Sequence, residues 1–265
     1  MSENKRMWLR LDNAAKLYPA VQTKNWSNVF RLSVTLNEKI DVVILQSALN
    51  HTIKRFPSIA MKLCKGFFWY YLEEITTAPD VIPEYSYPCS KMTRKDIKVC
   101  AFRVLYYENR IATEFFHSLT DGNGGMIFLK TLKAEYIFQK NKVKIPFNSG
   151  VLNRDEIPDI KELEDSFLKY DGTASESRRE ATAYKIRGTK EENFFHNLTI
   201  GIINLNDVLS VAKKYNVSLT AFLVSVMIYS IMQIQNAENP NKKKQKPVKV
   251  LIPVNLRKYF DSNSL

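Results

Sequence analysis

Apolar and polar residues follow two periods along the chain, and together these predict an α/β fold. In residues 42–56 the apolar positions recur every three or four residues, which is typical of an amphipathic helix, and Pro57 ends it. Residues 98–107 and 110–116 are rich in Val, Phe and Tyr and flank a polar dipeptide, which predicts an antiparallel hairpin. Helical spacing returns over residues 126–139.

The second half of the chain predicts a linker followed by a short helical block. Residues 172–192 are polar and mixed in charge, so we predict a linker or an exposed crossover. Asn206 and Ser218 are candidate N-caps of two helices, and the apolar residues 248–254 predict a buried strand. The predicted division is an N-terminal subdomain (1–171), a linker or crossover (172–192) and the beginning of a C-terminal subdomain (193–265).

The composition places the chain among ordinary globular proteins. Hydrophobic residues make up 45% and charged residues 25%, which argues against a disordered or fibrous chain. Cys64, Cys89 and Cys100 form neither a CxxC motif nor a zinc-ligand spacing, so we expect a reduced chain without a metal site. Residues 1–10 are polar and charged, whereas a secretory signal requires an apolar run. We therefore expect a cytoplasmic protein.

Two features bear on membranes and nucleic acids. Residues 217–234 are apolar and near the lower length limit for crossing a bilayer, but they include Ser, Thr and Gln, so we predict a buried core helix and no membrane span. The net charge is +12, and a basic run begins at Lys242. Such a run is usually a solvated loop, so we expect no nucleic-acid partner; polyanion binding through residues 242–249 is the alternative.

Five aromatic residues stand in a row at positions 67–71, with the sequence FFWYY. Such a run is able to line an apolar pocket, but a buried strand accounts for it more simply. We therefore predict a buried strand here.

The candidate chemistry lies where a predicted strand gives way to a predicted helix. The chain has only eight glycines, yet Gly122, Gly124 and Gly125 fall within four positions, directly after His117 and Asp121. Glycine between rigid elements allows a tight bend and a close backbone approach. A neutral imidazole accepts and returns a proton near pH 7, so His117 is a candidate general base.

Asp121 admits three interpretations. Its carboxylate, four residues after His117, is placed either to orient the imidazole directly or to hold the loop through an arginine. In the third interpretation there is no chemistry: His117 merely ends a strand, and Asp121 caps the following helix, where Asp is favoured. The spacing alone leaves all three open.

Other catalytic patterns are weaker. Ser118 lacks the G-x-S-x-G setting of a serine hydrolase. The segment DGNGG lacks the spacing of a dinucleotide site, and the sequence has no phosphate-binding loop. His51 and His196 have no partner at a recognisable spacing, so we assign them to the core or the surface.

The segment FFHSLTDGNGG resembles the active-site motif of the chloramphenicol acetyltransferase-like superfamily, which includes peptide-synthetase condensation domains and alcohol acetyltransferases. The segments WLRLDNAAKLYPA, KRFPSIAMKLCKGFFWYYLEE and IPVNLRKYF resemble the alcohol acetyltransferase branch and follow in that family's order. The resemblance implies an α/β two-layer sandwich of mixed sheet and helices. It also implies a truncated chain, with a complete first subdomain and the start of a second.

The resemblance assigns roles to individual residues. His117 matches the catalytic histidine, and Gly122 matches the motif glycine. Asp121 matches an aspartate that is usually structural and paired with an arginine. For that arginine, Arg257 is the preferred candidate and Arg10 the second.

The implied activity is acetyl transfer from acetyl-CoA to an alcohol, with His117 as general base. Phe116 stands where condensation domains often have another histidine, which favours the acyl-CoA branch. We expect no bound cofactor, an acyl-CoA co-substrate, a small-molecule acyl acceptor, and direct transfer in a ternary complex. Two alternatives remain: a condensation-type acyltransferase whose donor is bound to a carrier protein, and a truncated, non-catalytic binding protein.

Overall fold

The computed structural model of the protein describes residues 6–23, 26–165, 181–189, 191, 195, 197–260 and 262–265. These residues form two compact units. Unit 1 holds the described residues before position 172, residue 195 and Arg257–Leu265, and unit 2 holds the others. The predicted division at 171 and 192 stays a prediction, because much of the predicted linker lies outside the described residues.

Unit 1 is built on two β-sheets. The larger has the strand order β2-β7-β6-β5 and the smaller has the order β1-β4-β3. In the larger sheet β2, β7 and β6 pair antiparallel, and β5 lies parallel to β6. The sheet is therefore mixed. The strands are β1 (Trp8–Arg10), β2 (Val29–Thr35), β3 (Met61–Lys65), β4 (Tyr70–Glu74), β5 (Ile82–Pro83), β6 (Phe102–Tyr107) and β7 (Arg110–Phe116).

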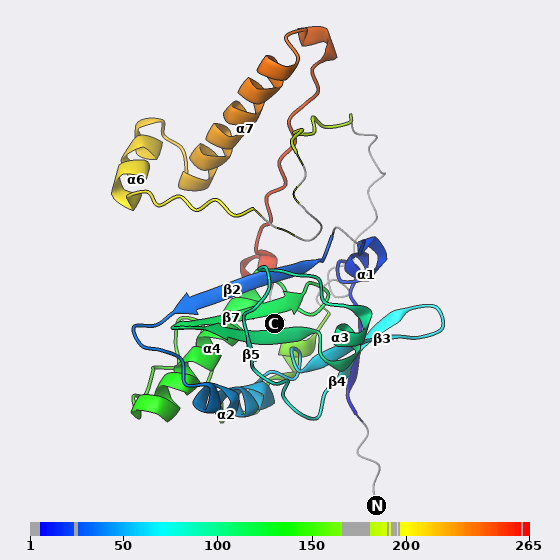
Figure 1. The fold of residues 1–265 in the computed structure, drawn as a ribbon, viewed down its shortest axis with the longest axis vertical. Helices are drawn as coiled ribbons and strands as arrows, with labels where there is room; N and C mark the ends of the chain where they lie inside the picture. Colours follow the sequence, from blue (N-terminus) through cyan, green and yellow to red (C-terminus); the bar gives the residue numbers. More distant parts are fainter. Residues whose placement is uncertain are drawn as a thin grey trace, which may run out of the picture. The chain divides into compact units, whose positions relative to one another are not determined.

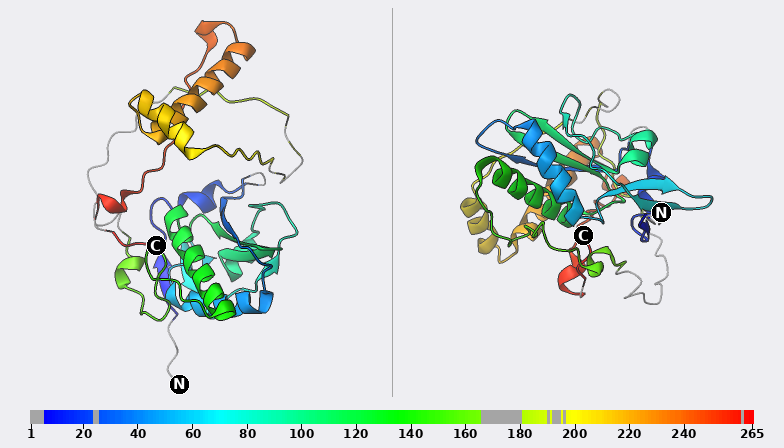
Figure 2. Two further views of the ribbon diagram at one scale, coloured as in Figure 1. Left: turned by 90° about the vertical axis from the view of Figure 1, so that its left-hand side faces the viewer. Right: turned by 90° about the horizontal axis from the view of Figure 1, so that it is seen from below.

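Two long helices lie side by side against one face of the larger sheet, as the two views in Figures 1 and 2 show. They are α2 (Val42–Thr52) and α4 (Gly122–Asn141). Shorter helices complete unit 1: α1 (Leu17–Val21), α3 (Arg94–Val99) and the single turns Ile53–Arg55 and Ile160–Leu163. A further turn, Leu256–Lys258, begins at the last residue of unit 2 and continues into unit 1. Helices over a mixed sheet make unit 1 an α/β fold, as the sequence predicts.

Four phenylalanine rings join the helices to the sheet. The ring of Phe128 in α4 lies 5.2 Å from Phe56, 5.4 Å from Phe102 and 5.8 Å from Phe115, in edge-on arrangements with interplanar angles of 80°, 69° and 86°. All four side chains are buried. Edge-to-face packing of this kind adds to the free energy of burial. Phe128 therefore lies at the centre of the core of unit 1.

Most of the predicted elements of unit 1 are present. Helix α2, the hairpin of β6 and β7, and helix α4 each overlap their predicted ranges. The first strand of the hairpin begins at Phe102 rather than at residue 98, because residues 94–99 form α3. Thr93 begins α3 with a capping box: its hydroxyl accepts from the amide of Asp96, whose carboxylate accepts from the amide of Thr93.

The prediction of a buried strand at 67–71 is wrong for its first three residues. Phe67, Phe68 and Trp69 form the exposed end of the hairpin that joins β3 to β4, and only the last two positions belong to β4. The amide of Gly66 donates to the carbonyl of Trp69, which closes the turn. An apolar run indicates a preference for burial, but a tight turn at this point leaves the rings outside.

Unit 2 contains the helices α6 (Leu205–Lys214) and α7 (Leu219–Glu238) and a turn at Lys242–Lys244. Ser218 caps α7 as predicted, by accepting a hydrogen bond from the amide of Ala221. The cap of α6 is Asn204, two residues before the predicted Asn206. The predicted strand at 248–254 is absent: the segment belongs to neither sheet of the described residues and is largely exposed.

The prediction that the apolar helix of unit 2 is buried is also wrong. Along α7 only Gln235 is buried. The exposed large apolar side chains of this helix are Leu223, Val226, Met227, Tyr229, Met232 and Ile234. The described part of unit 2 contains no sheet against which this helix is able to pack. On length and composition alone, Leu219–Glu238 qualifies as a candidate membrane span.

The core predicts the effect of one substitution. Phe128→Ala removes the ring on which Phe56, Phe102 and Phe115 converge, so we expect it to lower the free energy of unfolding by about 3–5 kcal/mol. Val43→Ala on the exposed face of α2, where the side chain is 79% exposed, is the control and changes stability by about 0.5 kcal/mol or less. Urea unfolding measures both, and similar values for the two variants contradict this packing.

Candidate active site

His117 directly follows the end of β7. Its backbone amide donates to the carbonyl of Asn28 at 2.9 Å, just before β2, so the position of the residue is fixed by the pairing of the two strands. Asn28 has a left-handed φ of 53°, a conformation that Asn adopts more readily than most residues. Its side-chain amide donates to the carbonyl of Tyr18 in α1. The end of the sheet thus holds α1 beside His117.

Two aromatic rings hold the imidazole. The ring of Tyr18 stacks on His117 with a centroid distance of 4.3 Å and an interplanar angle of 9°. Phe30 of β2 lies 4.9 Å from the imidazole, tilted by 55°. Burial, and then the charges of Asp12 and Asp121, raise the pKa of Tyr18, so its phenol is protonated at neutral pH. A flat, uncharged ring therefore covers a face of the imidazole.

The described part of the chain provides no hydrogen-bonding partner for the nitrogens of His117. Among the described residues, neither Nδ1 nor Nε2 makes a hydrogen bond or an ion pair, and the side chain is half-buried. A ring that is positioned by stacking and retains its hydrogen-bonding capacity is able to accept a proton from an incoming group.

Asp121 begins helix α4. Its Oδ1 accepts from the amide of Asn123 at 3.0 Å and from that of Gly124 at 2.9 Å. These are two of the amides that have no partner within the helix, and a carboxylate there also interacts favourably with the helix dipole. The cap fixes the bend between His117 and α4.

The other oxygen of Asp121 binds an arginine. Arg257 Nη1 lies 2.7 Å from Asp121 Oδ2, and Arg257 Nε donates to the carbonyl of Ser264 at 2.7 Å. The contact proposed from the sequence between Asp121 and Arg257 is therefore present. Arg10, the second candidate, lies in β1 opposite Tyr71. Since both carboxylate oxygens are engaged elsewhere, the geometry fits a structural role for Asp121; a direct catalytic role stays a prediction.

Burial alone raises the pKa of Asp121, but the hydrogen bonds from Arg257 and from the amides of Gly124 and Asn123 outweigh it. The pKa is thus held below its ordinary value of 3.8. The carboxylate is therefore charged throughout the neutral range.

Of the three motif glycines, Gly124 and Gly125 are the two positions where a larger side chain does not fit. A Cβ at Gly124 would meet the hydroxyl of Thr120 and lie 2.7 Å from the backbone carbon of Leu265. A Cβ at Gly125 would lie 3.1 Å from the ring of Phe115, so glycine here lets α4 lie close to the sheet. At Gly122, the motif glycine, a Cβ would meet nothing within 4 Å.

The remaining side chains near the motif are structural. Ser118 is buried, and its hydroxyl donates to the carbonyl of Ala15 at 2.8 Å. Phe116 is buried in the core of unit 1. Among the described residues there is no group of three or more His, Cys, Asp or Glu side chains arranged to hold a metal ion. His196 lies outside the described residues.

Sequence reasoning missed a second polar cluster, which joins α2 to α4. His51 Nδ1 lies 2.9 Å from Oε1 of the buried Glu135, which also forms an ion pair with Arg154 and accepts from Gln139 at 2.6 Å. Its members are far apart in the sequence, so no local spacing signals them. The cluster contains no nucleophile and lies apart from His117.

The pockets described on unit 1 lie elsewhere. One of about 470 Å³ is lined by residues of β1 and β4 together with Arg6 and Trp69, and one of about 560 Å³ is lined by residues around Ile53 and Ile75. His117 lines neither of them.

The comparisons with known proteins find structural but no sequence matches. No protein-family model matches the sequence. No curated protein matches it either.

About half of the chain is similar to solved structures. Polyketide synthase associated protein 5 from Mycobacterium tuberculosis is 16% identical over 52% of this chain and 35% of that chain, with a TM-score of 0.39. The starter condensation domain of rhizomide synthetase RzmA is 12% identical over 54% and 40%, with a TM-score of 0.41. The first condensation domain of the CDA synthetase is 11% identical over 53% of this chain and 42% of that chain, with a TM-score of 0.41.

The chain thus spans well under half of the length of these structures. At such identities and TM-scores the likeness carries no functional argument. Any function must rest on the chemistry of the residues themselves.

The surroundings of Gly122 and Gly124 predict different effects of an alanine substitution on stability. Gly124→Ala forces a methyl group against Thr120 and Leu265, so we expect it to lower the free energy of unfolding by about 1–3 kcal/mol. Gly122→Ala meets open space and gains helix propensity, so it leaves stability equal or slightly higher. Urea unfolding compares the two; a Gly122→Ala variant as unstable as Gly124→Ala is inconsistent with this placement.

The Asp121 ion pair predicts a pH dependence of stability. Because the pKa of Asp121 is lower in the folded chain than its ordinary 3.8, the stabilisation is fully present above that value and is lost as the pH falls through the folded pKa. Asp121→Asn keeps a capping oxygen but removes the charge. The difference in unfolding free energy between wild type and variant should be largest near neutral pH and shrink below about pH 4. A difference independent of pH speaks against the ion pair.

Proposed function

We propose that the protein is an acyltransferase that transfers an acyl group directly from a thioester to a hydroxyl group, with His117 as general base. The observation that carries the proposal is the state of this imidazole: stacking on Tyr18 holds it, and its nitrogens have no partner among the described residues. A buried structural histidine normally satisfies its nitrogens with protein groups. This one is left able to bind a proton.

The reaction balances with one proton passing through His117. The acceptor hydroxyl donates its proton to the imidazole while its oxygen attacks the thioester carbonyl carbon. The carbonyl electron pair moves to oxygen, which gives a tetrahedral intermediate. When this intermediate collapses, the carbon–sulfur bond breaks and the imidazolium returns the proton to the leaving thiolate. The products are an ester and a free thiol.

Direct transfer, without an acyl-enzyme, is supported by the thiols. Burial raises the pKa of Cys89 to about 11 and that of Cys100 to about 12, and it also raises the pKa of Cys64. A thiol with a raised pKa is a poor nucleophile at neutral pH, because the thiolate is the reactive form. Ser118 is buried and donates to a backbone carbonyl. Neither these thiols nor the hydroxyl of Ser118 is set up to carry the acyl group.

Asp121 and Arg257 hold the bend on which His117 depends. Their ion pair and the cap of α4 fix the segment directly after the imidazole. In this proposal they take no proton and act only by position.

We further propose acetyl-CoA, or another acyl-CoA, as donor and an alcohol as acceptor. This finer assignment rests on the resemblance of the motif and of the three flanking segments to alcohol acetyltransferases. The buried Phe116, in place of a second histidine, favours an acyl-CoA donor over a carrier-bound one.

The test is thiol release from acetyl-CoA that depends on an added alcohol. His117→Gln removes the base but keeps a polar side chain of similar size, so we expect the rate to fall by about 10²- to 10⁴-fold. His51→Gln is the matched control: it changes a half-exposed histidine outside the site and should leave the rate near that of the wild type.

A rate within a few-fold of wild type for His117→Gln removes His117 from the mechanism. If the unchanged chain binds acyl-CoA but releases no thiol with any acceptor, it is instead a non-catalytic binding protein. Activity only with carrier-bound acyl groups favours the condensation-type alternative.

A further inference from the structure

The end of the hairpin between β3 and β4 exposes three consecutive aromatic rings. Phe67 is 88% exposed, Phe68 is 82% exposed and Trp69 is 61% exposed. The rings pack on one another, with Phe67 and Phe68 edge to face at 4.5 Å and Phe68 stacked with Trp69 at 6.5 Å. In Figure 1 this hairpin is the cyan loop that extends away from the sheets of unit 1.

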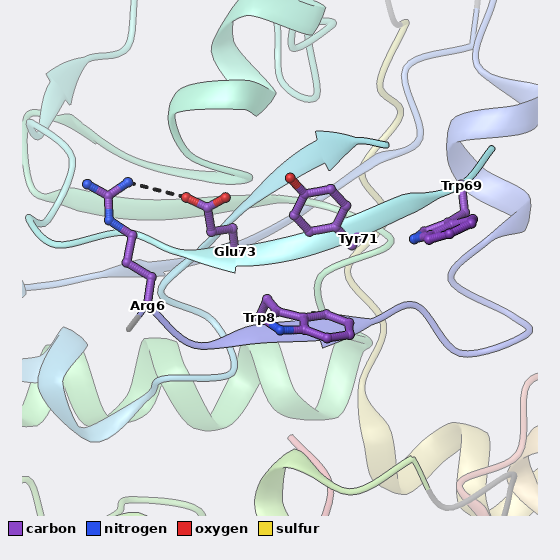
Figure 3. Close-up of a pocket in the computed structure, with 5 residues that line it drawn as sticks. All are labelled: Arg6, Trp8, Trp69, Tyr71 and Glu73. Carbon is purple, nitrogen blue, oxygen red and sulfur yellow. Dashed lines mark hydrogen bonds and ion pairs between the residues drawn. The ribbon is translucent and has the colours of Figure 1, made fainter. Parts of the chain in front are cut away.

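Two further aromatic side chains continue this surface behind the end of the hairpin. Trp8 of β1 is 62% exposed, and Tyr71 lies on the neighbouring strand β4. With Trp69, Arg6 and Glu73 they line the pocket of about 470 Å³ that Figure 3 shows. The aromatic surface therefore runs from the end of the hairpin onto the outer face of the smaller sheet. We call these five rings, Phe67, Phe68, Trp69, Trp8 and Tyr71, the aromatic hairpin surface.

A surface of clustered, exposed aromatic rings indicates an interaction site. Single exposed apolar residues are common, but a contiguous cluster of large rings in water marks an interaction site. The rings are not needed for the core of unit 1, which is made of other residues.

Basic residues lie on or beside the strands that carry the aromatic hairpin surface. Arg6 Nη1 lies 3.3 Å from Glu73, and Lys62 Nζ lies 2.8 Å from the same carboxylate, so one acid is shared by two bases. Arg10 and Lys65 are exposed, and neither has an ion-pair partner among the described residues. Counting Glu74, which also lies on β4, four bases stand against two acids, so these strands carry a net positive charge that complements an anionic partner.

We propose that the aromatic hairpin surface is a docking site for the interface of an anionic phospholipid bilayer. Phe67 and Phe68, purely apolar and outermost, enter the boundary of the acyl chains. Trp8, Trp69 and Tyr71 lie at the level of the headgroups, where amphipathic rings are enriched.

The arrangement favours a bilayer over a small aromatic or sugar ligand. A ligand in the pocket would contact Trp8, Trp69 and Tyr71 but would leave the two outermost rings in water. A bilayer accounts for the whole arrangement: apolar rings at the end of the hairpin, amphipathic rings behind them, and Arg10 on the same face of the sheet as Trp8 and Tyr71. Lys65 adds a further exposed cation beside the turn of the hairpin. The docking stands apart from the proposed acyl transfer, and it requires no helix to cross the membrane.

The experiment is co-sedimentation of the full chain with vesicles of phosphatidylcholine, with and without about a quarter of phosphatidylserine. We expect binding to the mixed vesicles and at least about tenfold weaker binding to phosphatidylcholine alone. Phe67→Ser with Phe68→Ser should reduce partitioning to mixed vesicles by at least about tenfold. These side chains are exposed, so the urea unfolding midpoint should remain that of the wild type.

The matched control is Val43→Ser with Ile157→Ser, which removes two similarly exposed apolar side chains elsewhere on unit 1 and should leave binding unchanged.

A second measurement locates the contact. In a chain with Trp8→Phe and Trp26→Phe, the fluorescence of Trp69 should be quenched by vesicles that contain brominated phosphatidylcholine. Mixed-vesicle binding that survives loss of Phe67 and Phe68, or no binding by the wild type, overturns the proposal. Charge reversal by Arg10→Glu with Lys65→Glu should abolish the preference for phosphatidylserine, and an unchanged preference also counts against it.

Discussion

The carboxylate of Asp121 is the group on which the candidate site depends. One oxygen accepts from two amides at the start of α4, and the other binds Arg257, which is 136 residues away in the sequence. A charged group that satisfies the helix terminus and a distant arginine at once fixes both the bend and the segment that carries the arginine. His117 is four residues upstream and is held by strand pairing and ring stacking, so its nitrogens need no structural partner.

The features predicted correctly from the sequence are those with local causes. The apolar period predicts α2 and α4, and the polar dipeptide between two β-rich segments predicts the hairpin of β6 and β7. Ser218 as a cap is a local signal of the same kind. The contact of Asp121 with Arg257 is not local, and only the resemblance of the flanking segments singled out that arginine.

The features that could not be predicted depend on what the rest of the chain supplies. Apolar composition indicates that Phe67, Phe68 and the side chains of α7 gain from burial, but not whether a surface is available to cover them. The stacking of Tyr18 on His117 and the ion pairs of Glu135 bring together residues from separate elements, so no spacing in the sequence reports them. Residues 248–254 have the composition of a strand but no neighbouring strand in the described part of unit 2.

The central claim is that the imidazole of His117 takes a proton from the acceptor hydroxyl. Chemical rescue tests it most directly: in His117→Gly, added imidazole should restore alcohol-dependent thiol release from acetyl-CoA in proportion to the concentration of its neutral form. The same addition should leave the wild-type rate unchanged. A glycine variant that imidazole does not rescue although it still binds acyl-CoA, or one that needs no rescue, contradicts the account.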